Sequence, residues 1–113
     1  MLLPNCAATV TVILGLLGLL MPIRVSQILG IKPESALGLS EFRATYGGFF
    51  IALGIGCLMS QSALVFSVVG AAWCTAAFVR IASAIMDKSH SWHNFAGIVF
   101  EASVGMCMIA VGF

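Results

Sequence analysis

Four long runs of hydrophobic residues, separated by short polar stretches, dominate this chain. They cover approximately residues 5–21, 41–59, 63–86 and 95–113. A helix needs about 20 mostly apolar residues to cross the hydrocarbon core of a membrane, and each run is close to that length. The pattern therefore predicts an all-α membrane protein, a single domain over residues 1–113 with four transmembrane helices in a compact bundle.

The polar stretch between the first two runs predicts both a helix end and a helix start. Pro22 closes the first helix, because proline cannot continue a helix without losing a hydrogen bond. Ser40 is placed to cap the second helix, with Glu41 in its first turn, where a carboxylate complements the helix dipole. Apolar and polar residues alternate over residues 23–32, which predicts a short amphipathic segment lying in the membrane interface.

Composition supports a membrane protein and excludes other classes. Of the 113 residues, 61% are hydrophobic and 8% are charged, whereas soluble domains carry roughly 25% charged residues. The net charge of +1 leaves no basic surface for nucleic acid. We therefore expect the lipid bilayer, and no nucleic acid, among the partners of this chain.

The basic residues predict an orientation. Arg24, Lys32 and Lys88 lie in polar stretches that an even number of spans places on one side of the membrane. By the positive-inside rule that side is cytoplasmic, so both termini lie on the non-cytoplasmic side. A bacterial inner membrane is the expected location, with a mitochondrial or plastid inner membrane as the alternative.

Two ionisable residues interrupt the apolar runs. Arg80 and Glu101 each lie about 10 Å from the same face at 1.5 Å per residue, and Glu41 and Arg43 enter from that face. Because an unpaired charge inside a membrane is costly, we expect these four side chains to meet, with Tyr46 donating its hydroxyl to them. Three interpretations stay open: a structural ion-pair network, a snorkelling Arg80 with a neutral Glu101, or a site for a transported ion or ligand.

Small residues at a spacing of about four positions predict where the helices pack. Such residues let backbones approach closely in lipid. The residues expected at helix contacts are Gly48, Ala52, Gly56, Ser67, Ala71, Gly97 and Gly105.

No pattern indicates a catalytic or metal centre. The four cysteines fall one in each apolar run, with no C-x-x-C pair and no histidine at ligand spacing. His90 and His93 flank Trp92 and leave two interpretations open, a pH-sensing or metal-binding pair or polar neighbours of an interfacial tryptophan. We expect no enzyme activity, no metal and no cofactor, while a bound lipid or pigment stays open.

The charged positions carry a resemblance to a known family. The motif S-E-x-R-A-x-Y-G-G opens the second helix, Ser83 and Asp87 follow Arg80 in the third, and Glu101 lies in the fourth. In these features nearly the whole chain resembles the domain of unknown function 4345 family of small four-helix membrane proteins. The most specific residues are Glu41, Arg43, Ala44, Tyr46, Gly47 and Gly48. The resemblance implies an integral membrane protein, mostly bacterial, and implies no activity or cofactor.

Two functions fit these observations. The first is a non-catalytic accessory subunit that stabilises a larger energy-transducing or transport complex, because the chain has almost no soluble surface and many small-residue positions. The alternative is a small carrier or channel for protons, lipid or a small amphiphile, with Arg80 and Glu101 as its polar site. Other membrane protein subunits are the expected partners under the first hypothesis.

Overall fold

The computed structural model describes residues 1–112, a range that contains helices joined by short loops and no strand. A π-helical segment joins two α-helices without a break, because the residues at both junctions keep right-handed helical geometry. The elements are α1 (Leu2–Leu20), α2 (Pro22–Leu29), α3 (Ala36–Arg43), η1 (Ala44–Phe49), α4 (Phe50–Ser60), α5 (Ala63–Met86) and α6 (Trp92–Ile109).

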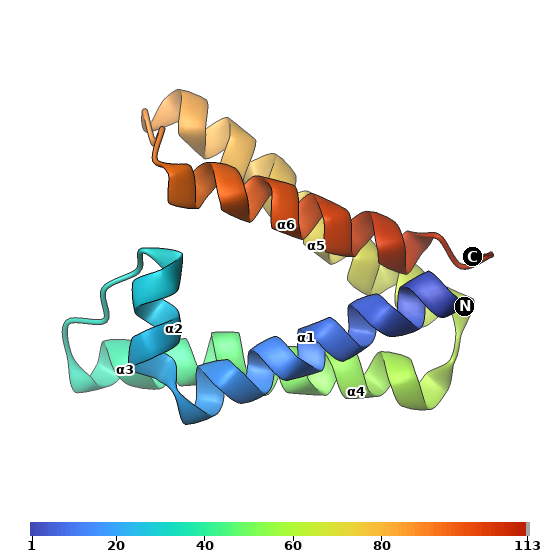
Figure 1. Cartoon of the computed structure of the whole chain (residues 1–113). Coiled ribbons are helices and arrows are strands. Elements are labelled where there is room, and N and C mark those ends of the chain that lie inside the picture. The colour runs from blue at the N-terminus through green and yellow to red at the C-terminus, as the bar shows by residue number, and fades with distance from the viewer. Residues whose placement is uncertain (113) are drawn as a thin grey trace.

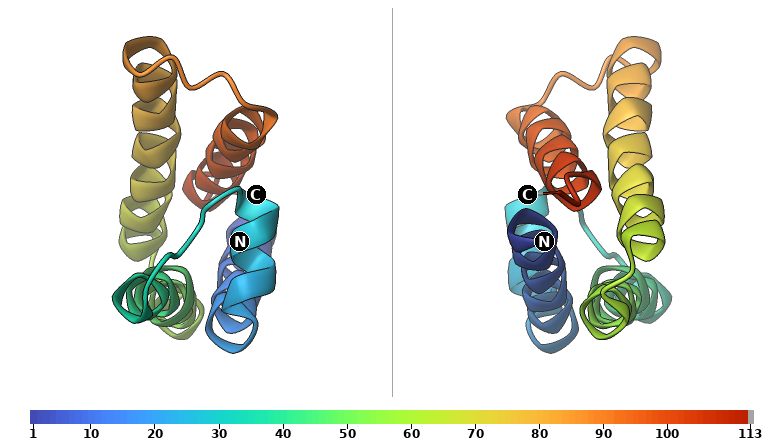
Figure 2. Two further views of the ribbon diagram at one scale, coloured as in Figure 1. Left: turned by 90° about the vertical axis from the view of Figure 1, so that its left-hand side faces the viewer. Right: turned by 90° about the vertical axis from the view of Figure 1, so that its right-hand side faces the viewer.

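The helices form two pairs that meet at one end and diverge at the other (Figure 1). One pair is α1 against η1 and α4, and the other is α5 against α6. Seen end-on, α6 lies over α1 and α5 lies over α4 (Figure 2). Both termini are at the closed end, and the short helix α2 lies in the opening of the wedge (Figure 1). The arrangement is therefore a splayed set of four long helices.

The buried core occupies the closed end of the wedge. Phe66 of α5 and Met108 of α6 are fully buried there, against Ala8 of α1 and Cys57 of α4. The side-chain amides of Asn5 and Gln61 hydrogen-bond to each other reciprocally, at 3.2 and 2.7 Å. Apolar burial holds the two helix pairs together at this end, and the amide pair ties the start of α1 to the residue that ends α4, within one pair.

Glycines set the close crossings inside each pair. A Cβ atom on Gly105 would lie 2.8 Å from the carbonyl oxygen of Gly70, and one on Gly70 would lie 2.9 Å from that of Gly105. In the other pair, a Cβ atom on Gly15 would lie 2.8 Å from the carbonyl oxygen of Gly47, and one on Gly54 would lie 2.8 Å from that of Ala8. Only glycine permits these backbone contacts.

Several residues expected at helix contacts lie elsewhere. Gly48, Ala52 and Gly56 are exposed, and a Cβ atom on either glycine would have no neighbour within 4 Å. Ala71 is exposed and Ser67 is half-buried. The prediction that Gly48, Ala52 and Gly56 contact another helix of this chain is therefore wrong. α1 packs instead against a different face of η1 and α4, at Gly47 and Gly54.

The ends of the helices also differ from expectation. Ser35, not Ser40, caps the second long helix, since its hydroxyl accepts a hydrogen bond from the backbone N–H of Gly38 at 3.0 Å. Glu41 consequently lies beyond the first turn. Pro22 follows the end of α1 as expected and is the first residue of α2.

Helices α5, α6 and α2 can be compared in the same way. α5 has the expected bounds of 63–86, whereas α6 begins at Trp92, three residues before the expected start at 95. Ser91 caps α6 by accepting a hydrogen bond from the N–H of Asn94 at 3.2 Å. The amphipathic pattern of residues 23–32 forms α2, which ends at Gly30 with a φ of 74°.

Candidate functional site

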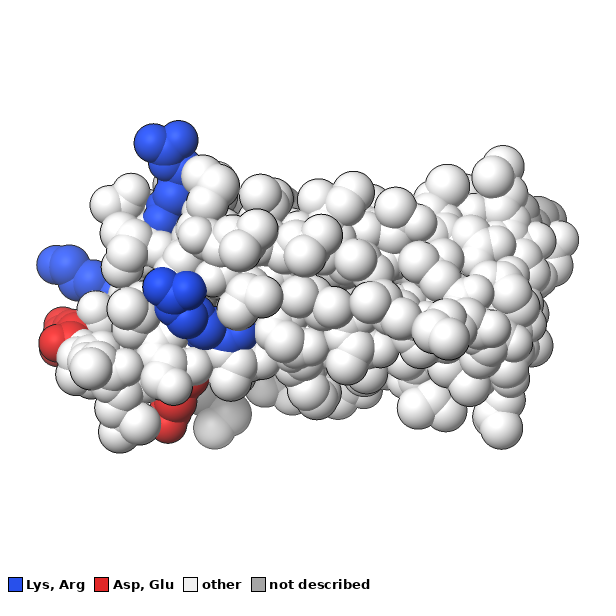
Figure 3. All heavy atoms as spheres, turned by 90° about the horizontal axis from the view of Figure 1, so that it is seen from below, with Lys and Arg blue, Asp and Glu red and all other residues white. Residues whose placement is uncertain are grey.

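Charged residues gather at the open end of the wedge. Figure 3 shows the Lys, Arg, Asp and Glu side chains of one face at that end, and none over the rest of the face. All nine charged residues belong to α2, the loop after it, α3, the second half of α5, the following loop and the middle of α6. The closed end contains no Asp, Glu, Lys or Arg.

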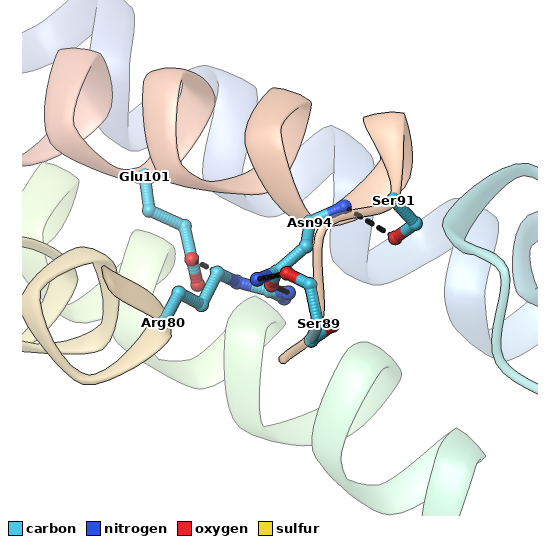
Figure 4. A network of polar contacts seen from close by, with 5 residues as sticks. All are labelled: Arg80, Ser89, Ser91, Asn94 and Glu101. Carbon is cyan, nitrogen blue, oxygen red and sulfur yellow. Dashed lines mark hydrogen bonds and ion pairs between the residues drawn. The ribbon is translucent and has the colours of Figure 1, made fainter. Parts of the chain in front are cut away.

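Arg80 connects three segments at the open end (Figure 4). Its Nε donates to a carboxylate oxygen of Glu101 on α6, and its NH1 donates to Oδ1 of Asn94 at 3.2 Å. The Asn94 amide in turn donates to the carbonyl oxygen of Ser89 at 3.1 Å. Arg80 thereby ties α5 to α6 and to the loop between them.

Local sequence explains how the pair can form. The side chains of Arg80 and Glu101 are 32% and 12% exposed, so the carboxylate is the more buried member. Gly97 lies one turn before Glu101, and a Cβ atom on it would come within 2.9 Å of Cζ of Arg80. Glycine at this position therefore leaves the space that the guanidinium occupies.

Glu41 and Arg43 do not join this pair, which corrects the expectation of a four-residue cluster. Arg43 donates from NH1 to the carbonyl oxygen of Leu19 at 2.8 Å, one of the last carbonyls of α1. The Glu41 side chain is exposed and has no hydrogen-bond or ion-pair partner within residues 1–112. Both residues belong to the α1–α3 side of the wedge, whereas Arg80 and Glu101 lie on the α5–α6 side.

A cavity of about 240 Å³ lies between the two helix pairs. Its wall is mainly apolar and includes residues of α1, α2, η1, α4, α5 and α6. Tyr46, Arg80 and Glu101 line it, so three of the five predicted site residues face one space. Tyr46 makes no hydrogen bond to either charged residue.

Aromatic side chains form a continuous row along this cavity. The ring centroids of Phe42 and Tyr46 are 4.6 Å apart, those of Tyr46 and Phe50 are 5.7 Å apart, and those of Phe50 and Trp73 are 5.1 Å apart. Phe100 extends the row onto α6, with its centroid 6.0 Å from that of Trp73. The row crosses from one helix pair to the other, and aromatic contacts of this kind are stabilising.

Trp73 carries an unpaired polar group beside the cavity. The residue is 7% exposed, and its indole N–H has no hydrogen-bond partner within the described residues. Buried tryptophan N–H groups usually have a partner. An unpaired donor in the wall of a cavity is typical of a place where a ligand or water supplies the acceptor.

The π-helical segment η1 places the phenol ring of Tyr46 in the cavity wall. Tyr46 lies in the middle of η1, which follows the charged positions of α3. Short π-helical turns occur frequently at functional sites. Here the segment has two neighbours at once, since Gly47 is buried against Leu19 of α1 while Tyr46 lines the cavity.

Histidine and cysteine positions add no metal site among residues 1–112, where no three His, Cys, Asp or Glu side chains gather. The Trp92 and His93 rings lie against each other, with centroids 4.2 Å apart, and both line the cavity. His93 also contacts Gly30, the residue that ends α2. His93 thus belongs to the mouth of the cavity.

Sequence reasoning missed two contributors to this site. Asn94 falls just outside the predicted fourth run of 95–113, because the apolar pattern begins at Phe95, although Ser91 is a residue type that commonly caps a helix. Trp73 gives no signal as a cavity residue, because a deep tryptophan in an apolar run is typical of a packed core.

The fold and the site define a small, all-helical protein in which three helices, Leu2–Leu20, Ala36–Ser60 and Ala63–Met86, are long and apolar enough to cross a membrane. A family model described as domain of unknown function (DUF4345) matches residues 4–111. The chain therefore belongs to the DUF4345 family. Searches of curated proteins and of solved structures found no match.

Proposed function

We propose that the chain is an integral membrane protein with four spans, in which α6 is the fourth. α6 has 18 residues, which corresponds to about 27 Å of helix against a hydrocarbon core of about 30 Å. It runs back along α5 and contacts it closely at Gly70 and Gly105. A helix packed this tightly along a membrane-spanning helix crosses the membrane beside it.

The orientation follows from the charged end of the wedge. That end faces the cytoplasm of a bacterial cell, or the matrix or stroma of an organelle, and both termini lie on the opposite side of the inner membrane. Alkaline phosphatase fused after Phe113 should be active in the periplasm, and the same enzyme fused after Lys88 should be inactive. The same result for both fusions, inactive in the proposed orientation, would show that α6 does not cross, and the reverse pattern would contradict the orientation.

We propose further that the protein is a non-catalytic accessory subunit that packs against a larger membrane complex, of the energy-transducing or transport kind. One observation supports this most directly. Gly48, Ala52 and Gly56 form a small-residue face along η1 and α4 that no helix of this chain covers within residues 1–112. Small residues at this spacing are typical of helix–helix contacts in membranes, where a second backbone can approach closely.

Native isolation tests the accessory role. The protein, expressed at its natural level, is purified in mild detergent, and everything that accompanies it is identified by mass spectrometry. A partner at a fixed ratio is expected. Replacement of Gly48 and Gly56 by leucine should reduce the recovery of the partner by at least about tenfold, which corresponds to a loss of about 1.4 kcal/mol of binding free energy.

Thr75→Leu is the matched control, because Thr75 is exposed on α5 and lies away from this face. It should leave the recovery of the partner unchanged. Purification of the wild-type chain alone would contradict the accessory role.

The cavity favours a second candidate, a small carrier or channel for protons, lipid or a small amphiphile. Arg80 and Glu101 line the cavity together, and charged residues inside membranes commonly mark transport paths. Liposomes containing the purified protein would show proton or lipid flux that Glu101→Gln abolishes. Flux equal to that of empty liposomes would contradict this candidate.

A further inference from the structure

We propose that the cavity binds one neutral, membrane-soluble compound whose planar ring carries carbonyl oxygens, as in a quinone head group. The inference does not depend on the accessory role. It rests only on the proposal that the chain spans a membrane, where such compounds are dissolved. No redox step is proposed, and the ring is bound in its oxidised form.

The aromatic row argues for a planar ring. Tyr46, Phe50, Trp73 and Phe100 all line the cavity, and their rings follow one another at 5.1 to 6.0 Å between centroids. A flat ring gains offset or edge-to-face contacts with such a wall, whereas a branched or straight aliphatic chain does not. The volume of about 240 Å³ is large enough for a small ring and its substituents.

Hydrogen-bonding groups argue for carbonyl oxygens on that ring. The indole N–H of Trp73 is buried without a partner, and the hydroxyl of Tyr46 has no hydrogen bond within residues 1–112. Arg80 uses its Nε and NH1 groups on Glu101 and Asn94, while its NH2 group has no partner there. These three donors along the wall are without a partner in the described range, so a ligand that supplies acceptors satisfies groups that are otherwise unpaired.

Charge argues for a neutral ligand. The positive charge of Arg80 is offset by Glu101, to which it is bonded. The Glu101 carboxylate would repel a fatty acid or a phosphate, and the Arg80 guanidinium would repel a cationic amphiphile. A neutral carbonyl compound avoids both repulsions.

The mouth provides a route for an apolar tail. Val25, Ile28 and Leu29 of α2 line the cavity, and Ile28 is 66% exposed. His93 on the facing helix contacts Gly30 at the end of α2. A ring seated against Trp73 therefore leaves its tail along α2, toward lipid.

Tryptophan fluorescence tests the proposal, because the two tryptophans of the chain, Trp73 and Trp92, both line the cavity and quinone rings quench indole emission. The purified full chain in detergent is titrated with a benzoquinone that carries one isoprene unit. Two competitors are then added: the same tail on a plain benzene ring, and the same tail as an alcohol without a ring. We expect saturable quenching, which neither competitor reverses at the concentration that the quinone needs.

Two variants and a control locate the site. Tyr46→Phe should weaken binding by about three- to tenfold, as expected for one lost hydrogen bond. Ala96→Leu, which fills the cavity, should weaken it by at least about tenfold. Ala71→Leu, at an exposed position of α5 that does not line the cavity, should bind as the wild type does. Circular dichroism checks that each variant keeps its helices.

Each other outcome overturns a stated part of the inference. Quenching that stays linear, or that is the same in all variants, excludes a site in the cavity. Displacement by the benzene analogue removes the role of the carbonyl oxygens, and displacement by the alcohol removes the ring as well. Binding by a chain that purifies without a protein partner would leave this site intact and contradict the accessory role alone.

Discussion

The guanidinium of Arg80 has two partners, Glu101 and Asn94, and the two contribute differently to the site. Glu101 supplies the opposite charge, and Asn94 supplies a neutral acceptor anchored to the carbonyl of Ser89. The pair is partly exposed at Arg80 and nearly buried at Glu101. Loss of either charge therefore leaves the other one poorly solvated in an apolar cavity wall.

Substitutions at the pair should show this dependence. We expect Arg80→Gln and Glu101→Gln each to lower the free energy of unfolding by about 1–3 kcal/mol, because a charge then remains without its partner. The double variant should regain part of the loss, since no unpaired charge remains. Accumulation in the membrane and thermal melting in detergent measure the effect, and equal stability of all three variants would contradict the ion-pair description.

At this scale the sequence predicts some contacts and not others. Arg80 and Glu101 could be expected to meet because each lies at a similar depth from one end of adjacent helices. The partner of Arg43 could not be foreseen, because the carbonyl of Leu19 becomes available only where α1 ends beside α3. Which acceptor lies nearest to a long side chain depends on how the helices are placed in space.

The helices pack through close backbone contacts that a few glycines permit. Gly70 and Gly105 bring α5 and α6 together, and Gly15, Gly47 and Gly54 do the same for the other pair. Glycines on the outer face of η1 and α4 make no such contact. The same residue type thus has two different roles in this chain, depending on the face that it occupies.

Alanine substitutions distinguish these two roles. Gly105→Ala should destabilise the protein by about 1–3 kcal/mol, because its Cβ atom would force the backbones of α5 and α6 apart. Gly56→Ala is the matched control on the open face. It should be neutral or stabilising by up to about 1 kcal/mol, since alanine favours a helix. Thermal melting of the isolated protein in detergent compares them, and an equal loss in both variants would be inconsistent with the crossing at Gly105.

Capping residues determine which element boundaries the sequence predicts. The apolar pattern predicted α5 correctly, because Ser62 and Asp87 flank a run that contains no proline and has Arg80 as its one charged residue. The start of the second long helix was wrong, since both Ser35 and Ser40 are suitable caps and Glu41 favoured the later one. η1 has no sequence signal apart from its two glycines, because a π-helical turn reflects the fit of α1 against Gly47.

The two ends of the molecule differ in character. Apolar burial closes one end, while charges surround the open end and its cavity. A compact bundle was expected from the four apolar runs. The splay could not be predicted from the sequence. The pattern placed residues 23–32 in the membrane interface, whereas α2 lies in the opening between the two helix pairs (Figure 1).

The proposed accessory role concerns the uncovered face of α4, and cross-linking in intact membranes tests it most directly. A photoreactive amino acid at position 52, in the middle of the Gly48–Gly56 face, is compared with the same amino acid at position 75 on α5. We predict one discrete cross-linked protein from position 52 and none from position 75. Cross-links to lipid alone from position 52, or identical products from both positions, would contradict a protein partner at this face.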